Sequence, residues 1–331
     1  MISTRTPYRI SFFGGGTDFP AYYQEHGGAV LSATINRYSY LHCRVLPPFF
    51  DHRYRIRCYQ TERVHRLEDI QHPSARECIR HLDFPHPLEI LHSGDLPSMS
   101  GIGSSSAFTV GLLLALYGLK GQICAKRQLS ENAVFVEQQL IKENVGSQDQ
   151  FAVAFGGLNR IDFGPGSHVQ VSPLTLTANR LEYLQNNLLF CFTGQSRLSS
   201  EIQAGHPGIR AQKSPSLSEQ RQLVEEGQKL LNGNEDDLDQ FGRLLGEAWQ
   251  IKRRLAPKVS RPDLDELYEY ALKHGALGGK LCGAGGGGFF LFYVQPHQRA
   301  KLSAALADAV MTVPIKFENL GAHVIFYTPH S

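Results

Sequence analysis

Residues 95–108 read DLPSMSGIGSSSAF, and this stretch decides the fold. It follows a strand-like run at 88–91 and leads into the apolar helical pattern of residues 111–116. In the first turn of a helix the backbone N–H groups lack helical partners, and the helix dipole favours negative charge. Glycines let the backbone approach phosphate oxygens closely, and serine hydroxyls add donors or a ligand for Mg²⁺. The stretch therefore predicts a phosphate-binding loop. The alternative is a simple helix N-cap, for which one serine is enough.

The length and composition of the chain are sufficient for two domains with a substantial hydrophobic core. It has 331 residues, 42% of them hydrophobic, and a formal net charge of +2. This near balance of charge indicates neither nucleic-acid nor membrane binding, and the apolar runs are too short to cross a bilayer. The six cysteines form no Cys-x-x-Cys pair, and the first residues do not read as a secretion signal. We therefore expect a reduced, cytoplasmic protein.

Strand and helix patterns occur in both halves of the chain. Strands are predicted at 8–13, 29–35, 38–46, 53–59, 158–163, 168–174, 188–192, 288–294 and 322–328. Helices are predicted at 131–144, 236–255, 263–274 and 296–310. Because strand and helix do not alternate regularly, the pattern favours an α+β fold over a doubly wound sheet. It changes near 175–186, which divides the chain into domains 1–180 and 181–331, and the polar stretches 60–87 and 200–220 are candidate mobile loops over a site.

Two further segments are rich in glycine. Residues 14–18 (GGGTD) end the first strand, and Asp18 is either a cap for the next segment or an acceptor for substrate hydroxyls. Residues 280–294 contain a G-x-G-x-x-G match, but a strand follows where the dinucleotide motif needs a helix. This second segment is therefore either a tight turn or a loop that shapes the phosphate loop or the acceptor pocket.

Two carboxylates are candidates for chemistry. Helical spacing places Glu137 on one face with Ala133, Val134, Leu140 and Ile141, where a charge needs a strong partner such as a metal ion. The alternative is that Phe135 and Val136 mark the buried face and Glu137 is solvated. Asp149 lies in an expected loop after that helix, where a carboxylate is usually a cap.

Taken together, these segments resemble the GHMP kinases. The resemblance rests on three stretches in family order: residues 7–18 (PYRISFFGGGTD), 97–107 (PSMSGIGSSSA) and 279–288 (GKLCGAGGGG). It implies an N-terminal domain like domain 2 of ribosomal protein S5 and a ferredoxin-like C-terminal domain. ATP would lie on the second stretch, and the acceptor would lie between the domains.

The resemblance also implies roles for particular residues. Asp149 resembles the catalytic aspartate that takes the proton from the attacking hydroxyl, and Arg9 resembles the arginine that pairs with it and keeps it ionised. Ser106 and Glu137 would bind Mg²⁺. The ATP-binding residues would be Ser100, Gly101, Ile102, Gly103, Ser104, Ser105 and Ser106. The expected cofactors are thus ATP and Mg²⁺.

Within the family, residues 9–18, 192–197 and 275–280 look most like the branch that phosphorylates D-glycero-D-manno-heptose 7-phosphate at its anomeric hydroxyl, which gives the 1,7-bisphosphate. That branch supplies nucleotide-activated heptose for bacterial surface glycans. Gly15 and Gly16 stand where galactokinases carry Glu-His, so galactose is not the expected acceptor. The expected substrate-binding residues are Gly15, Gly16, Thr17, Asp18, Arg197, Lys252, Gly285 and Gly286. Arg197 and Lys252 are expected to bind the distal phosphate of the acceptor, and the alternative for both is a solvated basic surface.

Other functions stay open at this point. The same residues suit a kinase for an octose phosphate, for fucose or for another sugar, and some galactokinase relatives only sense a sugar and a nucleotide. The expected partners are a sugar phosphate and ATP, with no nucleic acid and no membrane, and a homodimer is possible.

Overall fold

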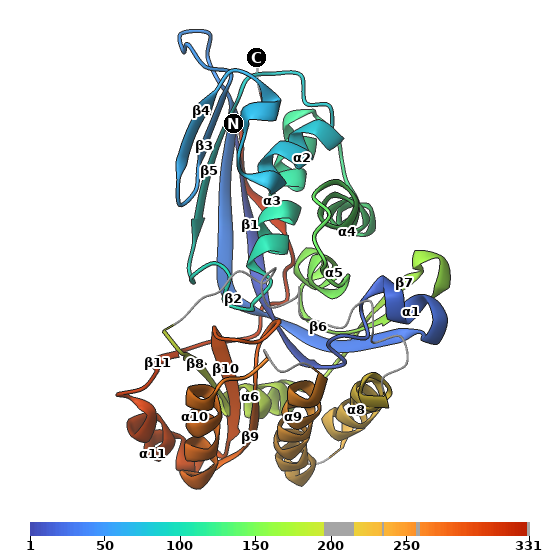
Figure 1. The fold of residues 1–331 in the computed structure, drawn as a ribbon, viewed down its shortest axis with the longest axis vertical. Coiled ribbons are helices and arrows are strands. Elements are labelled where there is room, and N and C mark those ends of the chain that lie inside the picture. Colours follow the sequence, from blue (N-terminus) through green and yellow to red (C-terminus); the bar gives the residue numbers. More distant parts are fainter. Residues whose placement is uncertain (195–214, 234, 256–258, 330–331) are drawn as a thin grey trace.

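The computed structural model describes residues 1–194, 215–233, 235–255 and 259–329. Its strands form an eight-stranded sheet and a four-stranded sheet, each with helices packed beside it (Figure 1). The strands are β1 Ile2–Phe13, β2 Gly28–Val45, β3 Tyr54–Arg57, β4 Thr61–Val64, β5 Leu88–Gly94, β6 Leu158–Phe163, β7 Val169–Pro173, β8 Leu188–Phe192, β9 Ala276–Leu281, β10 Phe289–Val294, β11 Met311–Val313 and β12 His323–Tyr327.

The α-helices are α1 Pro20–His26, α2 Pro73–His81, α3 Ser104–Leu119, α4 Lys126–Phe135, α5 Gln148–Phe155, α6 Ala178–Asn186, α8 Pro215–Asn232, α9 Glu235–Leu255, α10 Pro262–Lys273 and α11 Pro296–Leu306. Three short turns have other helical geometry: η1 Leu67–Asp69, η2 Val136–Leu140 and η3 Pro165–Ser167. The expected α+β class is confirmed.

The large sheet is organised around β2. Its strand order is β12-β1-β2-β5-β3-β4, and the first part of β2 also pairs with β6, which pairs with β7. Residues 29–35 and 38–46, expected as two strands, form this one strand. Helices α2 to α5 cover one face of the sheet (Figure 1). Helix α3 lies against β1 and β2 and is apolar nearly all round, as expected for a helix buried at the centre of its domain.

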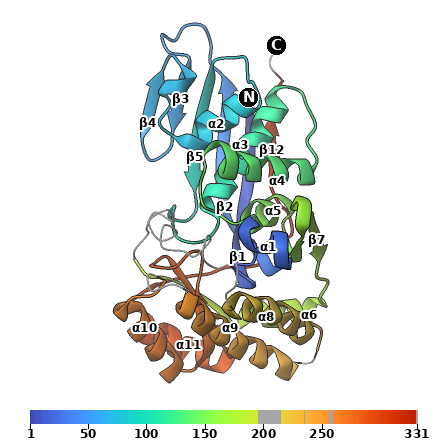
Figure 2. The ribbon, with the colours of Figure 1, turned by 45° about the vertical axis from the view of Figure 1, so that its right-hand side comes forward.

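The small sheet has the order β11-β8-β10-β9, and helices α6 and α8–α11 gather around it at the other end of the molecule (Figure 2). The chain does not stay in this domain to its end. Strand β12 returns to the large sheet and pairs antiparallel with β1. A single boundary at 180/181 is therefore wrong for the last strand, because only a partner far away in the sequence decides which sheet a terminal strand joins.

Two other expectations need correction. The stretch 60–87, expected as a mobile loop, contains β4, η1 and α2. Helix α2 begins at Pro73, and the ring of His72 caps it by accepting a hydrogen bond from Ala75 N at 3.3 Å. Of the stretch 200–220, residues up to 214 lie outside the described residues, and α8 begins at Pro215.

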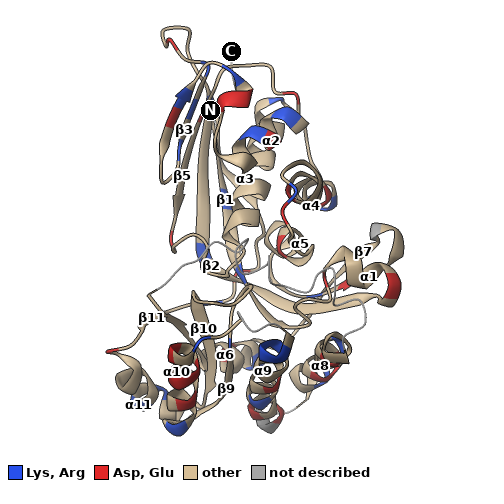
Figure 3. Ribbon diagram, in the orientation of Figure 1, with Lys and Arg blue, Asp and Glu red and all other residues tan. Residues whose placement is uncertain are grey.

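Charged residues of both signs are spread over both domains (Figure 3). This distribution agrees with the near-neutral net charge. Among the described residues, no helix has the length and apolar character needed to cross a bilayer.

Candidate active site

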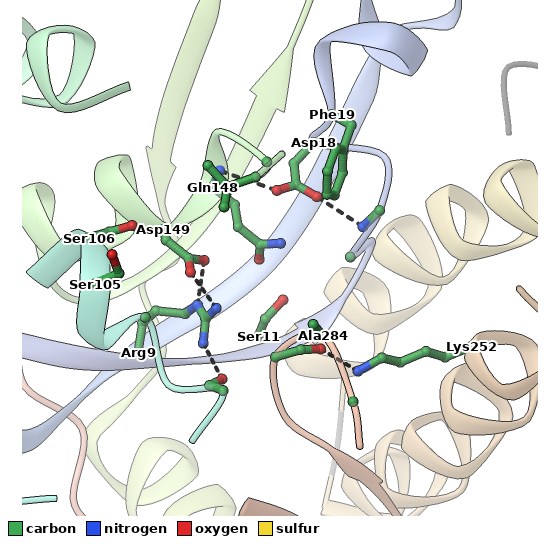
Figure 4. A pocket seen from close by; sticks show the side chains of 18 of the residues that line it. Arg9, Ser11, Asp18, Phe19, Ser105, Ser106, Gln148, Asp149, Lys252 and Ala284 are labelled. Atoms are coloured by element: carbon green, nitrogen blue, oxygen red, sulfur yellow. Dashed lines mark hydrogen bonds and ion pairs between the residues drawn. The ribbon is translucent and has the colours of Figure 1, made fainter. Parts of the chain in front are cut away.

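A pocket lies between the two domains and brings together segments that are far apart in the sequence. Its walls come from β1 and the turn after it, the loop before α3, the first turn of α3, η2, the first turn of α5, helices α8 and α9, and the glycine-rich loop after β9 (Figure 4). All three stretches that carry the family resemblance therefore meet at one place.

Arg9 and Asp149 form a bidentate ion pair in this pocket (Figure 4). Arg9 Nε lies 2.7 Å from Asp149 Oδ1, and Arg9 Nη2 lies 2.6 Å from Asp149 Oδ2. Arg9 Nη1 also donates to the carbonyl oxygen of Gly101 at 2.7 Å. One guanidinium thus orients the carboxylate and the serine-rich loop together. The Arg9 side chain is 5% exposed and that of Asp149 is 24% exposed, so a ligand can reach the carboxylate.

Asp149 stands in the first turn of α5 and not in a loop. A helix N-terminus stabilises a carboxylate through its unpaired N–H groups and its dipole, so this position suits a charge that faces a pocket.

The serine-rich loop has the shape of a phosphate cradle. Gly101 and Gly103 adopt left-handed backbone angles (φ 81° and 73°), and α3 begins at the next residue, Ser104. Both glycines and Ser104, Ser105 and Ser106 line the pocket. Ser100 and Ile102 lie behind it: Ser100 Oγ donates to the carbonyl oxygen of Pro97 at 2.6 Å, and the carbonyl oxygen of Ile102 accepts from Arg9 N at 3.1 Å.

The third glycine-rich stretch presses against this loop from the other domain. A Cβ atom on Gly283 would lie 2.2 Å from Gly101 Cα, and one on Gly288 would lie 2.3 Å from the carbonyl oxygen of Ser100. These contacts leave no room for side chains. The loop after β9 therefore shapes the serine-rich loop, one of the two roles foreseen for it.

Glu137 is buried beside the first turn of α3. It is 1% exposed, whereas Phe135 is 43% exposed, so the alternative of a solvated Glu137 is wrong. Its Oε2 accepts hydrogen bonds from Ser106 Oγ at 3.0 Å and from Gln150 Nε2 at 2.5 Å. Burial raises the pKa of Glu137 to about 8, with a further contribution from the charge of Glu143. Glu137 lies in η2, a π-helical turn of the kind often found at functional sites.

Ser106 and Glu137 fit one side of a Mg²⁺ site. Glu137 Oε1 is buried and has no hydrogen-bond partner within the described part of the chain, so it keeps a free lone pair. Carboxylate and hydroxyl oxygens are the hard ligands that Mg²⁺ prefers. The described residues contain no group of three or more His, Cys, Asp or Glu side chains placed to hold a metal ion. The remaining ligands would therefore have to be phosphate oxygens and water.

Asp18 lines the pocket and is 1% exposed. It accepts hydrogen bonds from the backbone N–H of Gly16 at 2.9 Å and of Gln148 at 3.3 Å. Burial raises its pKa, and the nearby charge of Asp149 raises it further. Gly15 and Gly16 line the pocket, whereas Thr17 is fully buried behind it and bonds to the carbonyl oxygens of Gly14 and Ala29.

Of the other residues expected to bind the substrate, some line the pocket and some do not. Lys252, on α9, reaches into the pocket and donates to the carbonyl oxygens of Leu281, at 2.9 Å, and Gly283. Gly285 lines the pocket, but Gly286 does not and instead donates from its backbone N–H to Val259. Arg197 lies outside the described residues.

The structure adds pocket residues that sequence reasoning did not select. Lys280, Ser11 and Gln148 all line the pocket. Lys280 is 5% exposed and sits in β9. The sequence signal that could have identified Lys280 was a single lysine among apolar and glycine residues. Burial of an ammonium group without a counter-charge is unfavourable, so such a lysine indicates a partner or a ligand. Ser11 carried no signal, since serine is common on strands.

The sequence matches the GHMP kinases N terminal domain over residues 72–157 and the GHMP kinases C terminal domain over residues 228–310. It is also 30% identical over 319 residues to D-glycero-alpha-D-manno-heptose 7-phosphate kinase of Campylobacter jejuni, which covers 92% of this chain and 93% of that protein. The chain belongs to the GHMP kinases. This kinase is therefore an ATP-dependent enzyme.

Solved structures agree with this assignment. The kinase resembles a D-glycero-D-manno-heptose 1-phosphate kinase from Bacteriodes thetaiotaomicron with a TM-score of 0.80 and 25% identity, over 100% of both chains. It resembles Lactococcus lactis galactokinase, solved with galactose, with a TM-score of 0.74 and 18% identity, over 97% of this chain and 94% of that one. The second likeness concerns the fold alone. The expected two-domain GHMP kinase fold is confirmed.

Proposed function

We propose that this kinase transfers the terminal phosphoryl group of ATP to the anomeric hydroxyl of D-glycero-D-manno-heptose 7-phosphate and forms the 1,7-bisphosphate. The heptose 7-phosphate kinase of Campylobacter jejuni, similar over nearly the whole of both chains, supports this acceptor. The observation that carries the proposal is the Arg9–Asp149 ion pair, because it faces the same pocket as the serine-rich loop.

In this proposal Asp149 is the general base. The anomeric hydroxyl gives its proton to a carboxylate oxygen of Asp149 while its oxygen attacks the terminal phosphorus of ATP, and ADP leaves. Each carboxylate oxygen has two acceptor positions, so the bonds from Arg9 leave room for this proton. Arg9 holds the carboxylate in place, and its positive charge offsets negative charge at the reacting centre.

The serine-rich loop would bind the triphosphate through the backbone N–H groups at the start of α3 and the hydroxyls of Ser104 and Ser105. Ser106 and Glu137 would hold Mg²⁺, which supplies neutralisation of charge on the phosphate oxygens when it is bound.

The acceptor would occupy the part of the pocket near Asp18. The Asp18 carboxylate would accept hydrogen bonds from sugar hydroxyls, and the missing side chains at Gly15 and Gly16 leave room for a seven-carbon sugar. A Cβ on Gly15 would have Gln148 Nε2, at 4.0 Å, as its nearest neighbour, which agrees with open space there. Lys252 and Gly285 would contact the acceptor from the second domain, and Arg197 stays a prediction.

A panel of acceptors tests the proposal. The purified protein is incubated with ATP, Mg²⁺ and one sugar at a time, and ADP release is measured. The sugars are D-glycero-D-manno-heptose 7-phosphate, an octose phosphate, fucose and galactose. We expect rapid turnover of the heptose phosphate only, with a new phosphorus NMR signal from an anomeric phosphate. Faster turnover of fucose or of an octose phosphate would contradict the acceptor, and no turnover of any sugar, despite nucleotide binding, would favour the sensor alternative.

The role in nucleotide-activated heptose synthesis for surface glycans, the cytoplasmic location and the homodimer stay predictions.

A further inference from the structure

Three side chains on the pocket wall next to Arg9 are not explained by the chemistry of Asp149. They are Lys280 on β9, Lys252 on α9 and Ser11 on β1. We propose that these three residues form a binding site for a phosphate group with two negative charges. This inference deepens the proposed function and rests on it for the source of that phosphate.

Lys280 is a buried ammonium group with spare donors. Its Nζ donates to the carbonyl oxygen of Phe12 at 2.7 Å, which uses one of its three N–H groups. Within the described residues no carboxylate forms an ion pair with it. An ammonium group that is removed from water without a counter-charge destabilises the protein, so an anion bound beside it would be strongly attracted.

Lys252 brings a second cation to the same place. Its Nζ bonds to the carbonyl oxygens of Leu281 and Gly283, so the strand of Lys280 and the loop after it also position Lys252. Burial lowers the pKa of Lys252 to about 7 and that of Lys280 to about 8. The charges of Lys280 and Arg9 lower the pKa of Lys252 further.

Ser11 supplies a hydroxyl with no other role. It is 8% exposed, and its Oγ is buried without a hydrogen-bond partner in the part of the chain that the structure describes. Ser11 lies two positions after Arg9 on β1, so both side chains project from the same face of the strand (Figure 4). A buried hydroxyl is normally paired, so a ligand oxygen is the partner that this position lacks.

The chemistry of the three groups selects a phosphate monoester. Two ammonium groups match its two charges, and the Ser11 hydroxyl adds a neutral donor. Asp149, a carboxylate of the same pocket, already has its charge offset by Arg9. Two sources can deliver this phosphate: the phosphate that the acceptor sugar already carries, or the terminal phosphoryl group of ATP.

A binding experiment that needs no turnover tests the site. The protein is first saturated with Mg²⁺-ADP, so that the serine-rich loop is filled, and is then titrated with inorganic phosphate while the unfolding temperature is recorded. We expect phosphate to raise this temperature in the wild type and in the exposed control variant Lys301→Met, and to leave it unchanged in Lys280→Met.

Without phosphate, Lys280→Met should unfold at the same temperature as the wild type or higher, because the variant buries no charge. A purely structural role, as the partner of the Phe12 carbonyl, would instead lower this temperature. Ser11→Ala keeps the shape of the strand and should weaken phosphate binding by about five- to tenfold at unchanged stability. Undiminished phosphate binding in both variants would overturn the site.

Kinetics then separate the two sources. If the acceptor delivers the phosphate, Lys280→Met raises KM for heptose 7-phosphate about tenfold or more and lowers kcat/KM for the unphosphorylated heptose much less. If ATP delivers it, the variant lowers kcat for both acceptors alike. Either pattern supports the site, and unchanged kinetics with both acceptors would overturn it. Failure of the wild type to phosphorylate any sugar phosphate would instead refute the proposed function, while the binding experiment would still judge the site.

Discussion

Ser106 Oγ lies 3.0 Å from Glu137 Oε2, although 31 positions separate the two residues in the sequence. This hydrogen bond joins the first turn of α3, which follows the serine-rich loop, to a buried carboxylate. The other oxygen of that carboxylate, Glu137 Oε1, has no hydrogen-bond partner among the described residues. Burial of an ionised Glu137 is unfavourable for folding, so we interpret its position as one that serves metal binding and does not stabilise the fold.

Glu137→Gln tests this interpretation. The amide has the shape of the carboxylate but no charge, so we expect the Mg²⁺ concentration for half-maximal rate to rise by about tenfold or more. The ligand-free variant should unfold at a higher temperature, because an uncharged side chain is less costly to bury. The exposed Glu131→Gln on α4 is the matched control. An unchanged Mg²⁺ dependence would show that Glu137 is only structural.

Asp149→Asn removes the proposed base and keeps its size. We expect kcat to fall by about 10²- to 10⁴-fold while ATP still binds, because the amide cannot take the proton of the sugar hydroxyl. Turnover and nucleotide binding are measured separately, with Asp83→Asn on the exposed surface as the control. Near wild-type turnover in Asp149→Asn would rule out its role as the base.

Substitutions at Gly15 and Gly16 distinguish the effect of pocket shape on acceptor binding from the effect of backbone conformation on stability. Gly15 has open space beside it, so Gly15→Leu should raise KM for the acceptor and leave ATP binding and stability nearly unchanged. Gly16 has a φ of 99°, and a Cβ there would lie 2.9 Å from Leu217 Cδ2, so Gly16→Ala should lower the free energy of unfolding by about 1 kcal/mol or more. Steady-state kinetics and urea unfolding of both variants check this. A Gly15→Leu variant with unchanged KM would place the acceptor elsewhere.

The lowered pKa of Lys252 predicts that stability depends on pH. Well below pH 7 Lys252 is charged in both the folded and the unfolded protein, because the pH then lies below its pKa in both states. As pH rises from about 7 toward its usual pKa of 10.5, the folded protein loses this proton before the unfolded chain does. The free energy of unfolding of the ligand-free protein should therefore rise over this range.

Lys252→Met should reduce that rise, and urea unfolding of both proteins at several pH values between 7 and 9 measures the difference. Phosphate affinity of the wild type should fall over the same range, because Lys252 loses its charge. An identical pH dependence of stability in Lys252→Met would contradict the assignment.

Local patterns predicted much of the fold. The helical periodicity of 236–255, 263–274 and 296–310 corresponds to α9, α10 and α11 within a few residues, and the apolar runs at 188–192 and 288–294 correspond to β8 and β10. Such predictions succeed because one face or both faces of these elements are buried in the nearest layer.

The pairing of elements that are far apart in the sequence could not be predicted from local patterns. Strand β12 crosses back to β1, and α2 forms within a polar stretch because its buried side chains, Cys78 and Ile79 among them, pack against the rest of its domain. The strand at 322–328 was predicted, but a local pattern does not say which distant strand it pairs with, and the polar composition around α2 hid a helix whose burial depends on distant residues.

The sequence by itself determined which residue types could do the chemistry: a glycine- and serine-rich turn before a helix, an early arginine and an aspartate at position 149. The family resemblance implied that Arg9 pairs with Asp149, but only the tertiary structure decided the geometry of that pair, the burial of Glu137 against Ser106, and the position of Lys280 and Ser11 on the same pocket. Each of these contacts joins residues from different elements, and its energy depends on distance and burial, which exist only once the chain has folded.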